Sequence, residues 1–209
     1  MSWIDEQLVA RGITDARVLD AMRRVPRDVF VPHEAQQAAY DDRALPIGSG
    51  QTISQPFMVA AMTEALRLTG SERVLDVGTG SGYQAAILSV LAREVITIER
   101  RPELAEMARH ALATLERTNV TVLTGDGTLG SPAHAPFDAI LVAAGAPRVP
   151  EPLKAQLAAD GGRLVIPVGS SAQQSLRIVT RDGDRFVETE GVGCVFVPLI
   201  GAEAWGEEP

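Results

Sequence analysis

The sequence predicts an open α/β sheet of mostly parallel strands, with an antiparallel hairpin at one edge and a helical extension at the N-terminus. From residue 73 onward, apolar runs of strand length alternate with segments of helical period, which is typical of a parallel sheet with right-handed crossovers. The first of these strands ends in Asp76-Val77-Gly78-Thr79-Gly80-Ser81-Gly82, a glycine-rich turn that opens a helix. The last two apolar runs are joined by Asp182-Gly183-Asp184, a turn short enough for a hairpin.

The N-terminal part predicts helices followed by a long loop. Residues 3–24 have the apolar spacing of two short helices, and Thr14 or Asp15 is suited to cap the second. Residues 40–56 are expected to form a long irregular loop, and a loop of this length inside a compact domain is usually functional. A helix follows this loop, with Pro56 near its start.

The apolar pattern divides the remaining chain into strands and helices. Strands are expected at residues 74–77, 94–99, 120–123, 137–142, 162–168, 175–180 and 186–199, and helices at residues 83–91, 102–117 and 151–157. No internal repeat or interdomain linker interrupts this order. We therefore expect one domain over residues 1–209, in which 1–56 supply the N-terminal helices and the active-site loop and 57–209 supply the core and the hairpin.

Composition limits the classes of partner. The 209 residues are 45% hydrophobic but only 4% aromatic, which predicts an aliphatic core. The formal net charge is −8 and no run of Lys or Arg exceeds two residues, so a nucleic-acid partner is not expected. Cys194 is the single cysteine, and neither a signal peptide nor a membrane span is visible. We expect a cytoplasmic protein without a membrane partner.

Acidic residues follow three successive strands at the edge of the sheet where a ligand binds. Asp76 ends the first predicted strand, Glu99 ends the second, and Asp126 lies in the Gly-Asp-Gly turn after the third. Glu99 stands about 20 residues beyond the glycine turn, where a carboxylate accepts hydrogen bonds from ribose hydroxyls. Asp126 is placed to reach an adenine amino group. Helix capping would explain any one of these acids, but three on successive strands indicate a nucleoside ligand.

The glycine turn is compatible with two ligand classes. Residues 80–85 match the loose pattern of dinucleotide-binding enzymes, so the pattern alone does not exclude NAD. Asp76 at the tip of the strand would repel a pyrophosphate, whereas it would attract the ammonium or sulfonium of S-adenosylmethionine. The residues therefore favour S-adenosylmethionine, with NAD as the alternative. A P-loop is excluded, because no Gly-Lys-Ser/Thr follows the turn.

Further motifs match one family along nearly the whole chain. They lie at residues 24–32, 51–56, 75–83, 125–127, 137–140 with 146–147, 161–169 and 196–199. With these motifs the sequence resembles the protein-L-isoaspartate (D-aspartate) O-methyltransferase family, whose fold is a Rossmann-like S-adenosylmethionine-dependent methyltransferase sheet. Many methyltransferases share the glycine turn. The loop Gln51-Thr52-Ile53-Ser54-Gln55-Pro56 and the segment Phe196-Val197-Pro198-Leu199 are much more specific to this family.

The resemblance implies a reaction and its substrates. A methyl group passes from S-adenosyl-L-methionine to the free carboxyl of L-isoaspartyl residues, and more weakly of D-aspartyl residues, in damaged polypeptides. The ester recloses to a succinimide, which hydrolyses partly to normal aspartate; S-adenosyl-L-homocysteine is the other product and no metal is needed. One rival is a methyltransferase of the same fold that acts on another carboxylate or a small molecule. The other is a non-catalytic cofactor- or peptide-binding relative.

The resemblance also implies the site residues. Ser54 is implied as the catalytic residue, whose hydroxyl donates a hydrogen bond to the substrate carboxylate; alone, it would be read as a helix cap. Thr52 is implied to assist from the same loop, and Cys194, Val195 and Val197 are implied to bind the substrate through backbone pairing near the last strand. Cys194-Val195 departs from the common family pattern, which puts the peptide preference in doubt. The implied cofactor site comprises Ile53, Ser54, Gln55, Asp76, Val77, Gly78, Thr79, Gly80, Ser81, Gly82, Glu99, Arg100, Asp126 and Gly127.

This chemistry needs no general base. A carboxyl group with an ordinary pKa of about 4 is ionised at neutral pH, so the protein has only to align it and exclude water. Accordingly, His33, His110 and His134 are expected to be structural or surface residues, because none of them stands at a strand end beside an acid.

Overall fold

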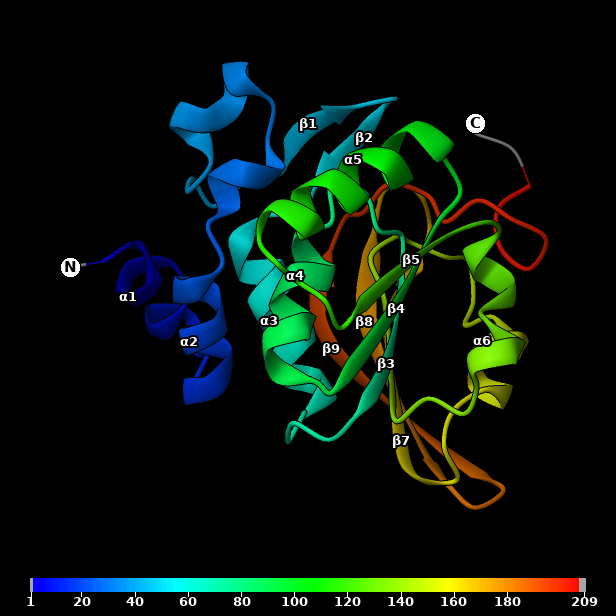
Figure 1. Ribbon diagram of the computed structural model, residues 1–209. Coiled ribbons are helices and arrows are strands. Elements are labelled where there is room, and N and C mark those ends of the chain that lie inside the picture. Colours follow the sequence, from blue (N-terminus) through cyan, green and yellow to red (C-terminus); the bar gives the residue numbers. More distant parts are fainter. Residues whose placement is uncertain (1, 207–209) are drawn as a thin grey trace.

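A seven-stranded sheet lies between layers of helices in the computed structural model, which describes residues 2–206 (Figure 1). The strand order is β5-β4-β3-β6-β7-β8-β9. Pairing is parallel from β5 to β7 and antiparallel for β7-β8 and β8-β9. The strands are β3 (Arg73–Val77), β4 (Glu94–Glu99), β5 (Val120–Thr124), β6 (Ala139–Val142), β7 (Asp160–Gly169), β8 (Gln174–Asp182) and β9 (Arg185–Cys194). The predicted sheet and its edge hairpin are confirmed.

The direction of the chain across the sheet reverses between β3 and β6. From β3 the chain moves outward through β4 to β5, and it then returns to β6 on the other side of β3. Ligands of open α/β sheets bind at the carboxyl ends of the strands where this reversal opens a crevice. The topology therefore places a crevice directly above the glycine turn that follows β3.

Alternate residues of the central strands face two different helical layers. On β3, Val74 belongs to the larger apolar cluster, whereas Leu75 and Val77 belong to the smaller one on the opposite face. Helices α3 (Pro56–Leu66), α4 (Tyr83–Leu91) and α5 (Pro102–Thr114) cover the first face, and α6 (Glu151–Ala155) covers the second (Figure 1). Because both faces are covered, every residue of β6 is buried, which explains its unbroken apolar run.

Short helices of the N-terminal extension pack on the outer side of α3 and α4. Helix α2 (Ala16–Arg24) starts after Asp15, whose carboxylate accepts hydrogen bonds from the N–H groups of Arg17 and Val18. Of the two predicted caps, Thr14 and Asp15, the helix therefore uses Asp15. Leu19 and Met22 are buried beneath this helix. The extension comprises α1 (Trp3–Gln7), η1 (Val9–Arg11), α2 (Ala16–Arg24), η2 (Arg27–Phe30) and η3 (His33–Ala38).

A small hairpin occupies much of the segment 40–56, so the prediction of a wholly irregular loop was wrong. Strand β1 (Leu45–Gly48) pairs antiparallel with β2 (Gln51–Ile53). The turn between them has positive φ at Gly48, Ser49 and Gly50. The prediction failed because both strands are shorter than the apolar runs that predict strands elsewhere in the chain. The glycines of the turn also favoured a loop.

The hairpin rests on the glycine turn of the main sheet. Leu45 and Ile47 alternate with exposed neighbours and are buried, which is the pattern of a strand with one covered face. The Cδ1 atom of Ile47 lies only 3.3 Å from the place that a Cβ on Gly80 would take. Burial of Ile47 stabilises this arrangement by about 1.5–3 kcal/mol, so the hairpin forms a fixed roof above the crevice.

The chain after β9 returns over the carboxyl ends of the strands. β9 ends at Cys194 rather than at Leu199, and Pro198 then lies beside Gly145 in an isolated parallel bridge. The ladder ends at Cys194 because its partner there, Gln174, is the first residue of β8. The helix predicted to reach residue 117 ends at Thr114. Across residues 2–206, we find no helix with both the length and the apolarity required to cross a bilayer.

Candidate active site

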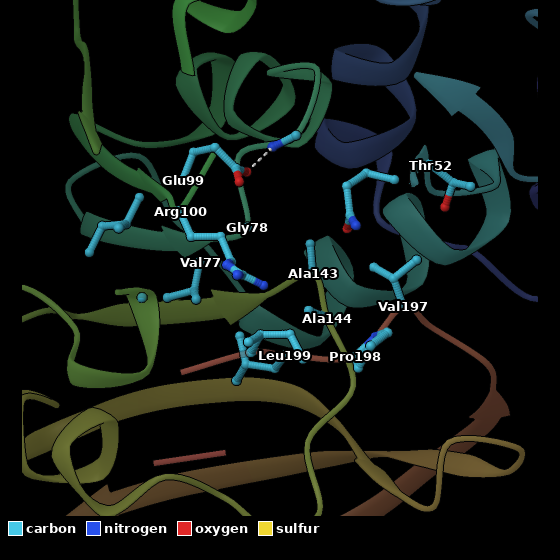
Figure 2. A pocket seen from close by; sticks show the side chains of 15 residues that line it. Thr52, Val77, Gly78, Glu99, Arg100, Ala143, Ala144, Val197, Pro198 and Leu199 are labelled. Atoms are coloured by element: carbon cyan, nitrogen blue, oxygen red, sulfur yellow. Dashed lines mark hydrogen bonds between the residues drawn. The ribbon is translucent and has the colours of Figure 1, made fainter. Parts of the chain in front are cut away.

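The crevice at the carboxyl ends of β3, β4 and β6 is a cleft with about 540 Å³ of free volume, including its open mouth (Figure 2). We call it the strand-end lobe. Glu99 and Arg100 lie on one side of it and Pro198 and Leu199 on another, as Figure 2 shows. Its lining residues are Gln51, Thr52, Val77, Gly78, Gly80, Ile98, Glu99, Arg100, Gly127, Ala143, Ala144, Val197, Pro198, Leu199 and Ile200.

Two smaller cavities join the strand-end lobe at Thr52 and Ala143, which line all three. The turn lobe has about 320 Å³ of free volume and lies against the glycine turn; it is lined by Thr52, Ile53, Ser54, Val59, Gly78, Thr79, Gly80, Ser81, Tyr83, Gln84 and Ala143. The outer lobe has about 330 Å³ and is lined by Ala44, Thr52, Ser54, Gln55, Met58, Ala143, Val195, Phe196 and Val197. The site is therefore a long ligand cleft with a side chamber at one end.

The glycine turn approaches the cleft with its backbone alone. Gly78 and Gly82 have φ values of 92° and 93°, which side-chain-bearing residues rarely adopt. The N–H of Gly78 donates to the carbonyl of Ile98 at 2.9 Å, which ties the turn to the end of β4. Gly82 is the N-cap of α4, and a Cβ there would stand 3.2 Å from Ala108. The turn is thus held against the end of β4 and against Ala108 of α5, and the N–H groups of Gly78, Gly80 and Gly82 all donate within the protein.

Glu99 is the carboxylate that borders the ligand space. Its side chain is 6% exposed and lines the strand-end lobe. One oxygen accepts a hydrogen bond from the N–H of Gly80 at 2.9 Å, drawn in Figure 2, and the other accepts from the N–H of Arg101 at 2.9 Å. These two donors fix the carboxylate while leaving it further acceptor capacity, as a group that binds a ribose diol requires.

Asp76 has a different environment from the one that the sequence suggested. Its side chain is fully buried and lines none of the three lobes, so it does not face a ligand directly. The hydroxyl of Thr97 donates to its Oδ2 at 2.8 Å, and Thr79 and Thr97 lie 2.6 Å apart through their hydroxyls. Its Oδ1 has no hydrogen-bond partner among residues 2–206. A role of Asp76 in cofactor binding stays a prediction, and it would act from beneath the turn.

Burial raises the pKa of Asp76 to about 7, the negative charge of Glu99 adds to the increase, and the hydrogen bond from Thr97 opposes it. The direction follows from the cost of an ionised carboxylate in an apolar interior with one of its oxygens unpartnered. The Asp76–Thr97–Thr79 chain therefore links the protonation of a buried acid to the glycine turn.

Asp126 is engaged by Thr128 of its own loop and by Ala202 of the C-terminal segment rather than directed at the ligand space. Its Oδ1 accepts from the N–H and hydroxyl of Thr128, and its Oδ2 accepts from the N–H of Ala202 at 2.9 Å. Burial by itself would raise the pKa of this carboxyl, but these hydrogen bonds outweigh burial and lower it. Only the adjacent Gly127 lines the strand-end lobe, so the predicted contact of Asp126 with adenine stays untested.

Small and apolar residues form the walls that sequence reasoning did not identify. Ala143 and Ala144 follow β6 at the reversal point, and Ile98 lies in β4 beside Glu99. The strand end after Val142 was expected to join the site, but alanines carry no chemical signature that would single them out. Gly127 is similar: a Cβ there would stand 2.5 Å from Cγ1 of Val77, so this wall has no room for a side chain. Ile98, Ala143 and Ala144 give this part of the lobe an apolar wall.

The C-terminal wall is held by one buried amide. Gln174 accepts from the N–H of Phe196 at 2.9 Å and donates to its carbonyl at 3.3 Å. The N–H of Gly145 donates to the carbonyl of Val197 at 2.8 Å. Among the predicted substrate residues, Val195 and Val197 line the outer lobe, whereas Cys194 lines no lobe. The backbone N–H and carbonyl of Phe196 are already bonded to Gln174, so a substrate chain would have to displace that amide to pair there. The exposed Val195 is therefore the better place for a substrate backbone to pair.

Ser54 stands at the junction of the turn lobe and the outer lobe and lines both. It is half-buried, and its hydroxyl makes no hydrogen bond to any other residue in the described range 2–206. The N-cap of α3 is Gln55, without a side-chain cap bond, so the alternative of a helix-capping serine does not apply. Ile53 lines the turn lobe and Gln55 the outer lobe. A free hydroxyl therefore faces the place where the two lobes meet.

None of the three histidines lines any lobe. His134 pairs with the hydroxyl of Ser131 at 2.7 Å, away from the cleft. Within the described residues we also find no group of three or more His, Cys, Asp or Glu side chains that could hold a metal ion. The polar side chains that line the lobes include the carboxylate of Glu99, the guanidinium of Arg100 and the hydroxyls of Thr52 and Ser54.

The sequence of residues 3–204 matches the family described as protein-L-isoaspartate(D-aspartate) O-methyltransferase. The chain belongs to this family. Protein-L-isoaspartate O-methyltransferase 2 of Marinobacter nauticus is 59% identical over 201 residues, which cover 95% of this chain and 91% of that protein. Protein-L-isoaspartate O-methyltransferase 2 of Pelobacter propionicus is 55% identical over 204 residues, with 97% and 90% covered.

Solved structures of the methyltransferase family share the fold. One protein-L-isoaspartate O-methyltransferase superposes with a TM-score of 0.85 at 28% identity; the match covers 94% of this chain and 64% of that longer one. A structure from Plasmodium falciparum, described as a protein-L-isoaspartate O-methyltransferase in complex with S-adenosyl-L-homocysteine, superposes with a TM-score of 0.79 at 26% identity. That match covers 93% of this chain and 95% of the other. The predicted Rossmann-like methyltransferase fold is thus confirmed.

Proposed function

We propose that this chain methylates the free carboxyl of L-isoaspartyl residues, and more weakly that of D-aspartyl residues, in damaged polypeptides, with S-adenosylmethionine as the methyl donor. The observation that carries the proposal is the position of Ser54 between the turn lobe and the outer lobe. A donor bound along the cleft and an acceptor in the outer lobe would meet beside its hydroxyl. Family membership supports the same reaction.

The residues present fit S-adenosylmethionine. Glu99 offers a fixed carboxylate for ribose hydroxyls, and Ile98 and Gly127 give the strand-end lobe an apolar wall beside which an adenine ring would lie. Gly78, Thr79, Gly80 and Ser81 line the turn lobe, where the amino-acid end of the cofactor would lie. The unpartnered Oδ1 of Asp76 lies beneath this turn, and a cationic ligand bound above it would favour the ionised form of this buried carboxyl. The bound cofactor supplies an electrophilic methyl group on a sulfonium.

The protein contributes orientation and the exclusion of water. The acceptor carboxylate is already ionised near neutral pH, so no residue has to remove a proton, in agreement with a cleft that no histidine lines. The hydroxyl of Ser54 donates to one carboxylate oxygen and leaves the other directed at the turn lobe. Thr52 and Ala143 surround the junction and limit the entry of water. Alignment of two bound reactants accounts for large accelerations without acid–base catalysis.

The polypeptide partner would bind at the exposed rim of the outer lobe. Val195 is 68% exposed and directly follows edge strand β9, so its backbone is accessible to an extended chain. Backbone pairing is tolerant of sequence, which suits a substrate defined by damage rather than by its neighbours. We place the reaction in the cytoplasm, where the one half-buried cysteine of the chain, Cys194, would remain a thiol.

Transfer of labelled methyl to an isoaspartyl peptide, with the matched aspartyl peptide as control, tests the function. We expect labelling of the isoaspartyl peptide only, and a loss of turnover in Ser54→Ala of about 10²-fold or more, typical of losing an aligned donor. The affinity for S-adenosylhomocysteine should change little. Ser49→Ala is the matched control, since Ser49 lies on the same hairpin but bonds to Glu103 and lines no lobe.

Equal labelling of both peptides would show that the acceptor is another carboxylate. No labelling despite tight cofactor binding would indicate a non-catalytic relative. Unchanged turnover in Ser54→Ala would remove the serine from the mechanism while leaving the substrate class in place.

A further inference from the structure

Asp42 connects the N-terminal extension to the loop that carries Ser54. It lies between η3 and β1, and its side chain is 19% exposed. Its Oδ1 accepts a hydrogen bond from the N–H of Phe57 at 2.9 Å. Its Oδ2 accepts from the side-chain amide of Gln55 at 3.3 Å and also from the guanidinium of Arg11. One half-buried carboxylate thus joins Arg11 of the N-terminal extension to the start of α3 at Gln55 and Phe57.

Two of these bonds fix the backbone immediately after Ser54. Helix α3 begins with Pro56, which has no N–H, so Phe57 provides the first free donor of the helix. Gln55 stands at the N-cap without a side-chain cap bond of its own, and Asp42 takes over that function from another part of the chain. A carboxylate at this end is also favoured by the dipole of an eleven-residue helix.

Arg11 reinforces the same contact from the other side. Its guanidinium carbon lies 3.5 Å from the centre of the Phe57 ring, and Phe57 is 8% exposed. Arg11 therefore neutralises Asp42 and covers the ring of the residue that Asp42 holds. The sequence analysis assigned no role to Arg11 or Asp42, and neither residue lines a lobe of the cleft.

We propose that Asp42 is a positioning residue that sets the Ser54 hydroxyl at the junction of the two lobes, with Arg11 holding Asp42 in place. Gln55 is the covalent neighbour of Ser54 and itself lines the outer lobe. A rotation of the peptide between them would move the hydroxyl away from the acceptor, and a misplacement of about 1 Å costs about 10²-fold in rate. This inference rests on the proposed function, because it concerns the use of Ser54.

The adjacent residue provides a matched control. Asp41 differs from Asp42 in pairing only with Arg43 at 3.2 Å, where both side chains are more than half exposed. We expect Asp42→Ala to lower kcat/KM for an isoaspartyl peptide by about 10- to 100-fold. The Kd for S-adenosylhomocysteine should stay within about twofold of the original, because the bound cofactor would lie beyond Asp42. Asp42→Asn keeps an oxygen for the Phe57 N–H and should recover part of the activity, and Asp41→Ala should change neither quantity.

A double-mutant cycle separates positioning from a general loss of structure. If Asp42 acts through Ser54, then adding Asp42→Ala to a Ser54→Ala variant should lower kcat/KM for the isoaspartyl peptide by less than about threefold. Equal losses in both backgrounds, or loss of cofactor affinity in Asp42→Asn, would overturn the proposal. Hydrogen exchange of the Phe57 amide is a readout independent of activity: it should accelerate in Asp42→Ala or Arg11→Gln and not in Asp41→Ala. Should the unmodified protein fail to methylate the peptide, the function falls, while the exchange data still decide whether Asp42 holds the loop.

Discussion

Replacement of Asp76 by Asn should change how the stability of the fold depends on pH. The carboxyl is fully buried, and burial raises its pKa from 3.8 to about 7. The folded state therefore holds a proton that the unfolded chain has released at any pH between these values. Stability from this group is complete below pH 3.8 and is lost as the pH rises toward 7, where the folded group also ionises.

The magnitude follows from the width of this interval. Between pH 5 and pH 7 the loss is about 1.4 kcal/mol per pH unit, which is about 3 kcal/mol in total. Asn cannot ionise, so the variant lacks this loss. We compare the free energy of unfolding of Asp76→Asn with that of the original protein. The difference, variant minus original, should be about 3 kcal/mol larger at pH 8 than at pH 5.

Urea unfolding at pH 5 and pH 8, followed by circular dichroism, measures this difference of differences. Other ionisable groups are the same in both proteins, so their contributions cancel. A difference between the two proteins that does not vary with pH would show that Asp76 is ionised throughout the range, and it would refute the assignment of a buried, protonated acid beneath the glycine turn.

Two further outcomes concern the ligand cleft and the thiol. Glu99→Gln should weaken the binding of S-adenosylhomocysteine by about tenfold or more, because it removes a charged acceptor at the ribose position. Calorimetry measures this affinity, and Glu103→Gln, at an exposed site, is the control. Equal affinities of Glu99→Gln and the original protein would exclude Glu99 from the cofactor site. Burial raises the pKa of Cys194 to about 11, so iodoacetamide should alkylate it at pH 8 at least about tenfold more slowly than a free thiol; a rate like that of free cysteine would contradict this.

The main sheet could be predicted from the sequence because each of its elements carries several agreeing signals. Strand β4 combines an apolar run with an acidic end, and α4 is bounded by a glycine in the left-handed region at Gly82. The hairpin β1-β2 carried fewer signals, since its strands are short and its turn is rich in glycine. Its stability depends on contacts of Ile47 with the distant Gly80, which no local pattern reveals.

The site was predictable where the residue type and its place in the chain determine its role, and less so where orientation decides. Glu99 lines the cleft as expected, whereas Asp76 ends the neighbouring strand and is buried beneath the turn. Both are acids at strand ends, and only the packed structure distinguishes them. Asp126 accepts from Thr128 in its own loop, as short carboxylates often do, and from Ala202, a contact between distant residues that no local pattern reveals.

The outer lobe is built from two stretches that are synthesised far apart in time. Ser54 leaves the ribosome roughly 140 residues before Val195, an interval of about 7–28 s at typical rates of translation. Until the segment after β9 has folded over the strand ends, a growing chain has a roof above its glycine turn but no wall against which to hold an acceptor. Fragments truncated by interrupted synthesis or proteolysis before Val195 would therefore lack methylating ability, and catalytic competence would appear only at the end of folding.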